Sequence, residues 1–114
     1  NMKKINKPWG YELLIENNKY YSVKKLFMKK GKRCSLQFHQ KKKETIYVLS
    51  GNLKITVGRS SKNLRKKIFR KGDFLTILPK IIHRMEAVTD SVYLEASTSQ
   101  LKDVVRLQDD YNRK

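Results

Sequence analysis

Residues 31–51 read GKRCSLQFHQKKKETIYVLSG and carry the most informative local pattern in the chain. Two short runs in which apolar and polar residues alternate, 34–39 and 45–50, lie on either side of the polar stretch 40–43. Alternation of this kind is typical of strands that bury one face. Because the second run follows after so few polar residues, this segment predicts a strand, a turn and a returning strand.

The same pattern extends outward from this segment. Gly51-Asn52 separates the apolar runs 46–49 and 53–57 and is the clearest hairpin signal in the chain. Strands are predicted for residues 20–28, 34–39, 45–50, 53–57, 67–69, 74–78, 83–88 and 92–96. We therefore expect an all-β sandwich or small barrel. The tail is an exception, because residues 101–105 fit a short helical turn capped near Ser99.

The length and composition of the chain indicate a small domain without a membrane span. With 114 residues, we expect one domain over residues 1–114. No apolar run approaches the roughly 18 residues that a spanning helix needs, and no charged-then-apolar leader is present. The lone Cys34 has no partner for an internal disulfide, so a cytoplasmic protein is expected. Asn1 precedes Met2, and we expect it to be an expression remnant.

The net charge predicts an anionic partner. The chain has 27 Lys and Arg against 10 Asp and Glu, a formal charge of +17. Nucleic acid, an acidic membrane surface or a phosphorylated small molecule would each match this charge. The basic residues are scattered over several segments, with no aromatic-interleaved motif and no Cys/His finger. This distribution disfavours nucleic acid and also fits a solvated, lysine-rich surface.

Four side chains form a candidate metal site. Gln37 and His39 are two residues apart and project to the same face of their strand. The returning strand can bring Glu44 beside His39, and His83, the only other histidine, must come from a separate strand. Two imidazoles, a carboxylate and an amide oxygen suit Zn²⁺, Fe²⁺, Mn²⁺ or Ni²⁺, with positions left open for water or substrate.

These spacings resemble the two motifs of the cupin superfamily. The first motif corresponds to Gly31, Gln37, His39, Glu44 and Gly51, with Gln in place of the first His. In the second motif Gly72 and His83 hold the two ends at the expected separation, but Lys80 replaces a glycine. A residue other than glycine resists the positive φ that this turn would need. The resemblance implies a double-stranded β-helix, that is, a jelly-roll barrel.

Within the cupins, the chain resembles the C-terminal domain of type II mannose-6-phosphate isomerases. The matching segments are KPWGYE at 7–12, GKRCSLQFH at 31–39, HRME at 83–86, DVVR at 103–106 and DDYNR at 109–113. The resemblance implies a stand-alone, metal-dependent aldose–ketose isomerase in polysaccharide or nucleotide-sugar precursor synthesis, with Zn²⁺ as the first choice of metal. The nucleotidyltransferase domain of the fused enzymes is absent from this sequence, so that activity is not carried over. By the same resemblance, we expect a homodimer that pairs through residues 7–14.

Substrate contacts are assigned as follows. Arg106, in the resembling tail motif, is the first choice for the phosphate, because a guanidinium matches phosphate oxygens in pairs. Arg33 shares strand parity with Gln37 and His39 and should face the same cavity, and Lys24 is a further candidate. Glu95 is preferred as the general base, because parity with His83 places Glu86 on the opposite face.

Other functions remain open at this point. A non-catalytic module that binds a sugar phosphate or nucleotide sugar would need the same fold and pocket. A cupin dioxygenase using Fe²⁺ fits less well with the Gln ligand and the basic residues. Nucleic-acid binding is the most distant alternative.

Overall fold

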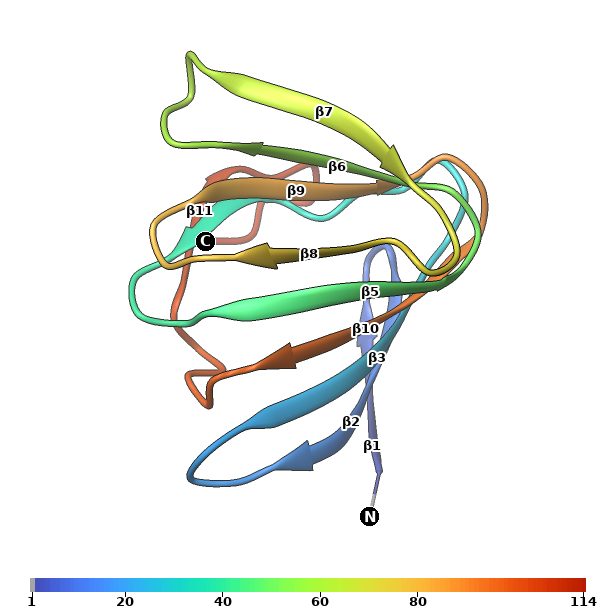
Figure 1. The fold of residues 1–114 in the computed structure, drawn as a ribbon, viewed down its shortest axis with the longest axis vertical. Coiled ribbons are helices and arrows are strands. Elements are labelled where there is room, and N and C mark those ends of the chain that lie inside the picture. The colour runs from blue at the N-terminus through green and yellow to red at the C-terminus, as the bar shows by residue number, and fades with distance from the viewer. Residues whose placement is uncertain (1) are drawn as a thin grey trace.

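Residues 2–114 are described by the computed structural model, and they form eleven strands in two antiparallel sheets (Figure 1). The first sheet contains, in spatial order, β1 (Lys3–Lys7), β2 (Gly10–Asn17), β3 (Ser22–Met28), β10 (Ser91–Ser97), β5 (Glu44–Ser50) and β8 (Phe74–Ile77). The second contains β11 (Val104–Gln108), β4 (Leu36–His39), β9 (Ile82–Ala87), β6 (Leu53–Gly58) and β7 (Leu64–Phe69). The prediction of an all-β jelly-roll is confirmed. The expectation for Asn1 lies outside the described residues.

The core lies between the two sheets. Strands β3, β5 and β10 alternate between buried and less buried positions, as expected for strands with one inward face. Fully buried apolar side chains include Met28, Ile46, Val48, Leu53 and Ile55. Each contributes roughly 1.5–3 kcal/mol relative to an exposed position. The described residues include no helix long and apolar enough to cross a membrane.

Charged residues replace apolar ones at one end of these inward faces. Lys24 on β3, Glu44 on β5 and Glu95 on β10 are all buried. The strand registers bring them together, because Glu95 pairs with Lys24 and Ser97 pairs with Glu44. The apolar core therefore gives way to a polar interior at this end of the sandwich.

Two turns adjoin the strands that carry the predicted ligands: one follows β5, which begins with Glu44, and the other precedes β9, which carries His83. Gly51 has φ +82°, and a Cβ there would lie 2.1 Å from the Asp90 carbonyl oxygen, so the predicted hairpin needs glycine. Lys80 adopts φ 69° despite its side chain. Its backbone N–H donates to the His39 carbonyl at 2.7 Å. This bond joins the turn before His83 to the strand that carries His39.

The two ends of the chain differ from the sequence predictions. Residues 7–14, expected as one strand for exchange between copies, instead form part of the β1–β2 hairpin, and β2 pairs with β3 of the same chain. Residues 101–105 do not form a helical turn. The tail instead extends as β11, which pairs with β4 and so satisfies the backbone hydrogen-bonding groups along that edge of β4. A homodimer stays a prediction, and β1 is at the edge of its sheet.

Candidate metal centre

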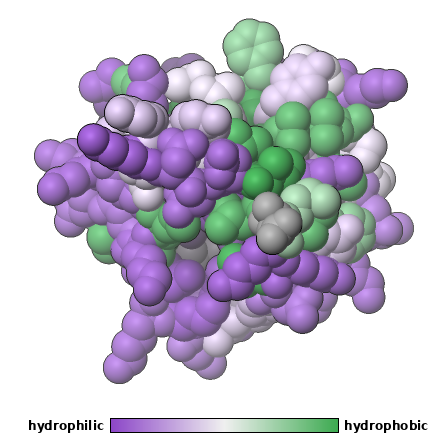
Figure 2. All heavy atoms as spheres, turned by 90° about the horizontal axis from the view of Figure 1, so that it is seen from below, coloured by the Kyte–Doolittle hydropathy of each residue, from purple (hydrophilic) through white to green (hydrophobic). Residues whose placement is uncertain are grey.

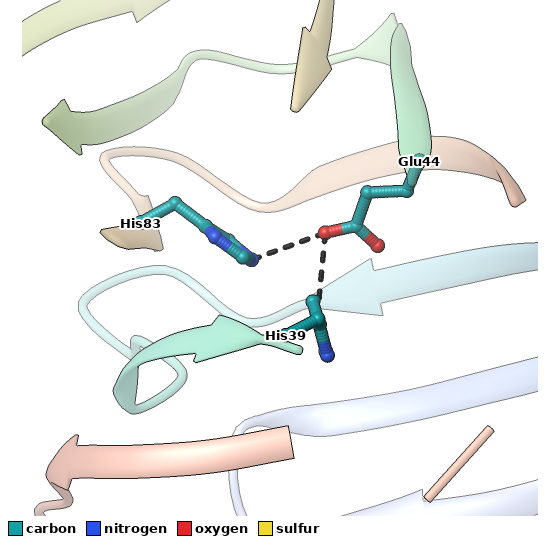
Figure 3. Close-up of side chains that lie close together, drawn as sticks. All are labelled: His39, Glu44 and His83. Carbon is teal, nitrogen blue, oxygen red and sulfur yellow. Dashed lines mark ion pairs between the residues drawn. The ribbon is translucent and has the colours of Figure 1, made fainter. Parts of the chain in front are cut away.

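His39, Glu44 and His83 bring one ligand atom each to within 4.8 Å of one another. Figure 3 shows the two imidazoles and the carboxylate directed toward one another. His39 ends β4, His83 lies on the neighbouring β9, and Glu44 begins β5 in the opposite sheet. Glu44 Oε1 lies 3.0 Å from His83 Nε2 and 3.7 Å from His39 Nε2. Both sheets therefore supply ligands to one buried point.

The donor atoms fit a divalent cation. His83 Nδ1 lies 2.9 Å from the Ile81 carbonyl oxygen, which can only accept, so this nitrogen carries the proton. In the neutral ring Nε2 then presents a lone pair to Glu44 Oε1, and neither atom has a hydrogen-bond partner. The nitrogens of His39 are also buried and unpartnered. Buried acceptors that face one another are costly, and a metal ion between them would satisfy all three residues.

The electrostatics favour the protonation states that bind metals. Burial lowers the pKa of His39 to about 4, against the opposing attraction of Glu44, so its ring is neutral at physiological pH. Burial alone would raise the pKa of Glu44, but the hydrogen bond that the His83 ring donates when it is protonated at Nε2, and the Lys42 ammonium, lower it below the ordinary value. A neutral imidazole and an ionised carboxylate are the forms that coordinate.

Gln37, the predicted fourth ligand, lies beside this cluster. It pairs with His83 across β4 and β9. Its Oε1 accepts a hydrogen bond from the Ser35 hydroxyl at 2.5 Å, which orients the amide. Gln37 as a ligand remains a prediction.

A cavity of about 370 Å³ adjoins the cluster. Figure 2 shows the end of the molecule where the β1–β2 hairpin lies, with hydrophilic side chains around a smaller hydrophobic area. The cavity is lined by apolar residues, by His39 and Gln37, and by many charged side chains: Lys3, Lys7, Glu12, Lys24, Lys42, Glu95, Lys102, Arg106 and Arg113. An anionic, polar molecule is the kind of ligand that this lining suits.

Two of the predicted phosphate ligands line this cavity. Arg106, on β11, donates to the Lys114 carbonyl, and its Nε is buried without a partner. Lys24 also lines the cavity, but its Nζ lies 3.1 Å from Glu12 Oε1. The Lys24 charge is thus already compensated, whereas Arg106 keeps a free donor.

Arg33 lies elsewhere, and the expectation that it faces the cavity is wrong. Among the described residues, those that line the cavity include its neighbour Cys34 but not Arg33. The Arg33 guanidinium instead donates to both carboxylate oxygens of Asp110 at 2.7 and 2.9 Å. Parity failed because residues 34 and 35 are not part of a strand, so the alternation of β4 does not extend back to Arg33.

Glu95, the predicted general base, is 6% exposed and lines the cavity. Burial, followed by the charge of Glu44, raises the pKa of Glu95 to about 7, although Lys42 and Lys24 act in the opposite direction. A carboxyl group with this pKa can both accept and return a proton near neutral pH.

Lys42 is a residue that sequence reasoning missed. It is 4% exposed, and its Nζ lies 2.9 Å from Glu95 Oε2 and 3.3 Å from Glu44 Oε2. The run 41–43 resembles a solvated turn, and Lys41 and Lys43 are indeed exposed. The spacing of two residues from Glu44 was the signal that could have identified it.

Comparison with known proteins identifies the family. A sequence profile described as "Mannose-6-phosphate isomerase C-terminal" matches residues 1–109. "Mannose-1-phosphate guanylyltransferase 2" of Escherichia coli O157:H7 is 37% identical over 60 residues, which are 53% of this chain and 12% of that protein. "Mannose-1-phosphate guanylyltransferase ManC" of Salmonella typhimurium is 26% identical over 121 residues, covering 97% of this chain and 23% of the relative. The chain thus corresponds to only a small part of these relatives.

Solved structures agree with this fold. The capsular polysaccharide assembling protein CapF from Staphylococcus aureus has a TM-score of 0.83 at 17% identity, over 95% of this chain and 34% of that one. Oxalate decarboxylase from Bacillus subtilis gives 0.82 at 14% identity, over 94% and 30%. KdgF from Halomonas sp. gives 0.76 at 13% identity, over 90% and 91%. The chain thus has the cupin fold and belongs to the mannose-6-phosphate isomerase C-terminal family.

Proposed function

We propose that this chain is a metal-dependent aldose–ketose isomerase that acts on a phosphorylated hexose of the mannose 6-phosphate type. The family membership supports a sugar-phosphate-related role. The observation that carries the proposal is the buried cluster of His39, Glu44 and His83, whose unpartnered donor atoms adjoin a cavity that also holds Glu95 and Arg106.

The reaction moves one proton between neighbouring carbon atoms. Glu95 takes the proton from the carbon next to the aldehyde, which leaves an enediol, and returns it to the former aldehyde carbon. A second proton passes from the hydroxyl group on the carbon that lost its proton to the oxygen of the former aldehyde. That carbon becomes the ketone, so the atoms balance. A divalent ion held by His39, Glu44 and His83 would supply Lewis-acid stabilisation of the negative charge on the enediol oxygens. The pKa of Glu95, raised to about 7 chiefly by burial, suits both proton transfers.

The phosphate group needs cations away from the reacting carbon atoms. Arg106 supplies a guanidinium with an unpartnered Nε, and Lys102 and Arg113 also line the cavity. Charge-assisted pairs between a guanidinium and a phosphate are among the stronger hydrogen bonds in proteins. Arg106 is therefore the residue that we expect to determine phosphate affinity.

Zn²⁺ is the metal that we propose. Two histidines and one glutamate are a familiar catalytic zinc set, with a position left for water or substrate. The same ligands also accept Mn²⁺, Fe²⁺ and Ni²⁺. A solved neighbour, the oxalate decarboxylase from Bacillus subtilis, is described with Mn(II) centres, which supports a divalent metal.

A second candidate is a module that binds a sugar phosphate or a nucleotide sugar without converting it. It is favoured by the curated relatives, which are named guanylyltransferases and of which the chain spans 12% and 23%. Such a module would need the cavity and its cations but not the acid–base function of Glu95.

A reconstitution experiment separates the two. The protein is stripped with a chelator, reloaded in parallel with Zn²⁺, Mn²⁺, Fe²⁺ or Ni²⁺, and assayed for conversion of mannose 6-phosphate to fructose 6-phosphate. We expect turnover with at least one metal, loss of turnover in Glu95→Gln with metal content retained, and little change in Glu86→Gln. Binding of mannose 6-phosphate without turnover in all four preparations would refute the isomerase and support the binding module.

A further inference from the structure

A stripe of buried charges crosses the first sheet, with one residue on each of four neighbouring strands. In the sheet order β5, β10, β3, β2, these residues are Glu44, Glu95, Lys24 and Glu12. Glu95 pairs in register with Lys24, and Lys24 Nζ lies 3.1 Å from Glu12 Oε1. Lys42 bridges Glu44 and Glu95 at 3.3 and 2.9 Å. When Lys42 is counted between Glu44 and Glu95, the charges alternate in sign from the candidate metal centre to β2.

The inner part of this stripe has a role in the proposed reaction, but the outer pair of Glu12 and Lys24 does not. Both residues are buried, with exposures of 7% and 8%, and both line the cavity. Their neighbours in the cavity wall include the apolar Trp9 and Leu26. Two apolar residues could fill these positions without the cost of removing two charges from water.

The pair is also not needed to hold its two strands together. Strands β2 and β3 are joined along their length by a backbone ladder, from the pairing of Gly10 with Met28 to that of Asn17 with Ser22. A buried ion pair adds little to stability compared with two well-packed apolar residues in the same positions. Its position on the wall of the cavity therefore points to a ligand.

We propose that Glu12 and Lys24 form a subsite for the hydroxyl groups of the substrate's carbon chain. This inference rests on the proposed function and names how the same cavity recognises a sugar rather than another anion. A carboxylate accepts hydrogen bonds from hydroxyl groups, and an ammonium donates to their oxygens, so the pair can bind both partners of a polyol. The subsite lies on the side of Glu95 away from Glu44, and Lys3 and Lys7 of β1 line the cavity next to it.

The test measures binding by calorimetry, so it does not depend on turnover. Mannose 6-phosphate and its 3-deoxy and 4-deoxy analogues are titrated into the metal-loaded wild-type chain and into Glu12→Gln and Lys24→Met. We expect at least one deoxy analogue to bind the wild type about 10- to 100-fold more weakly, as expected for a hydrogen bond to a charged group. In Glu12→Gln the parent sugar should weaken by a similar factor, and the difference between parent and analogue should shrink.

Glu16→Gln is the matched control, because it is the same substitution on the same strand, at an exposed position. Metal content should be equal in all four proteins. If both analogues bind the wild type as tightly as the parent, the subsite is refuted, and this result needs no variant to fold. If Glu12→Gln keeps the full wild-type discrimination between parent and analogues, Glu12 is refuted as the residue responsible.

The outcomes also separate this inference from the isomerase. Discrimination that depends on Glu12 in a protein that shows no turnover supports the subsite and refutes the isomerase. Turnover with a deoxy response that does not depend on Glu12 supports the isomerase and refutes the subsite.

Discussion

Two clusters of ionisable side chains in this molecule are built differently. The metal cluster, His39, Glu44 and His83, is buried, and four of its ring and carboxylate atoms have no hydrogen-bond partner. The tail cluster contains two ion pairs: Arg33–Asp110, at 2.7 Å, joins the last residues to the barrel, and Arg113–Asp109, at 2.9 Å, lies within the tail itself. These atoms of the metal cluster have no hydrogen-bond partner within the protein, whereas each charge of the tail cluster is paired with an opposite charge.

This difference separates a ligand site from a structural contact. Tyr111, between the two tail pairs, donates its hydroxyl to the Arg33 carbonyl at 3.1 Å, so this cluster attaches the tail. Buried polar atoms are rarely left unpaired in folded proteins, and those that are need an explanation. We propose a bound cation as that explanation for His39, Glu44 and His83, and the following experiments test the contrast in order of expected effect.

The largest effect is expected on metal binding. His39→Ala should lower metal affinity by more than the roughly 10–100-fold that loss of a residue behind a ligand costs. A chelator should lower the melting temperature of the wild type but not that of His39→Ala, because a bound ion stabilises only the folded state. Metal content is measured by elemental analysis, with Gln40→Ala in the exposed turn as the control. Equal metal content in His39→Ala and wild type would show that the cluster is not a metal site.

The next largest effect is expected from Lys42→Met. The change leaves Glu44 and Glu95 buried without the ammonium that lies within 3.3 Å of both. Breaking a buried ion pair costs about 3–5 kcal/mol. Urea unfolding of the metal-free protein measures this loss, and Lys41→Met, at the exposed neighbouring position, serves as the control. A Lys42→Met protein as stable as Lys41→Met would contradict the structure.

A smaller effect should distinguish the two arginines that were both predicted to bind phosphate. Arg106→Gln should weaken binding of inorganic phosphate about 10-fold, as expected for the loss of one charge-assisted hydrogen bond. Arg33→Gln should leave phosphate binding unchanged, because Arg33 is paired with Asp110 and lies outside the cavity lining described above. Calorimetric titration measures both, and the opposite pattern would restore Arg33 as the anion ligand.

The smallest effect concerns pH and the tail cluster. Hydrogen bonds from Arg113 lower the pKa of Asp109 from 3.8 to about 2. Because the folded-state pKa is the lower one, the stabilisation is complete above about pH 4 and is lost as the pH falls toward 2. Asp109→Asn should cost about 1 kcal/mol or less at pH 6, and this cost should vanish near pH 2. Denaturant unfolding across this range measures it, and Arg113→Gln should show the same pH dependence if the pair is responsible.

The sequence predictions succeeded where the chain is regular and failed where regularity ends. Within β4 the alternation correctly placed Gln37 and His39 toward one side, because both lie in one continuous strand. Arg33 precedes an irregular pair of residues, so the same rule gave the wrong side. Lys42 was missed because it lies in a lysine run that resembles a solvated turn, and its spacing from Glu44 does not show the second carboxylate, from β10, that it contacts.

The amino-acid sequence by itself determined the all-β class and indicated His39, Glu44 and His83, whose ligand atoms the fold brings within 4.8 Å of one another, as candidate metal ligands. Both follow from short-range spacing, since the alternation of a strand and the positions of His39, Glu44 and His83 relative to glycine turns are local properties. Only the tertiary structure decided which charges meet. The order β2, β3, β10, β5 joins strands that are far apart in the chain, and this pairing brings Glu12 and Lys24 into one stripe with Glu95. Burial and long-range pairing set these contacts, and neither is encoded in any single segment.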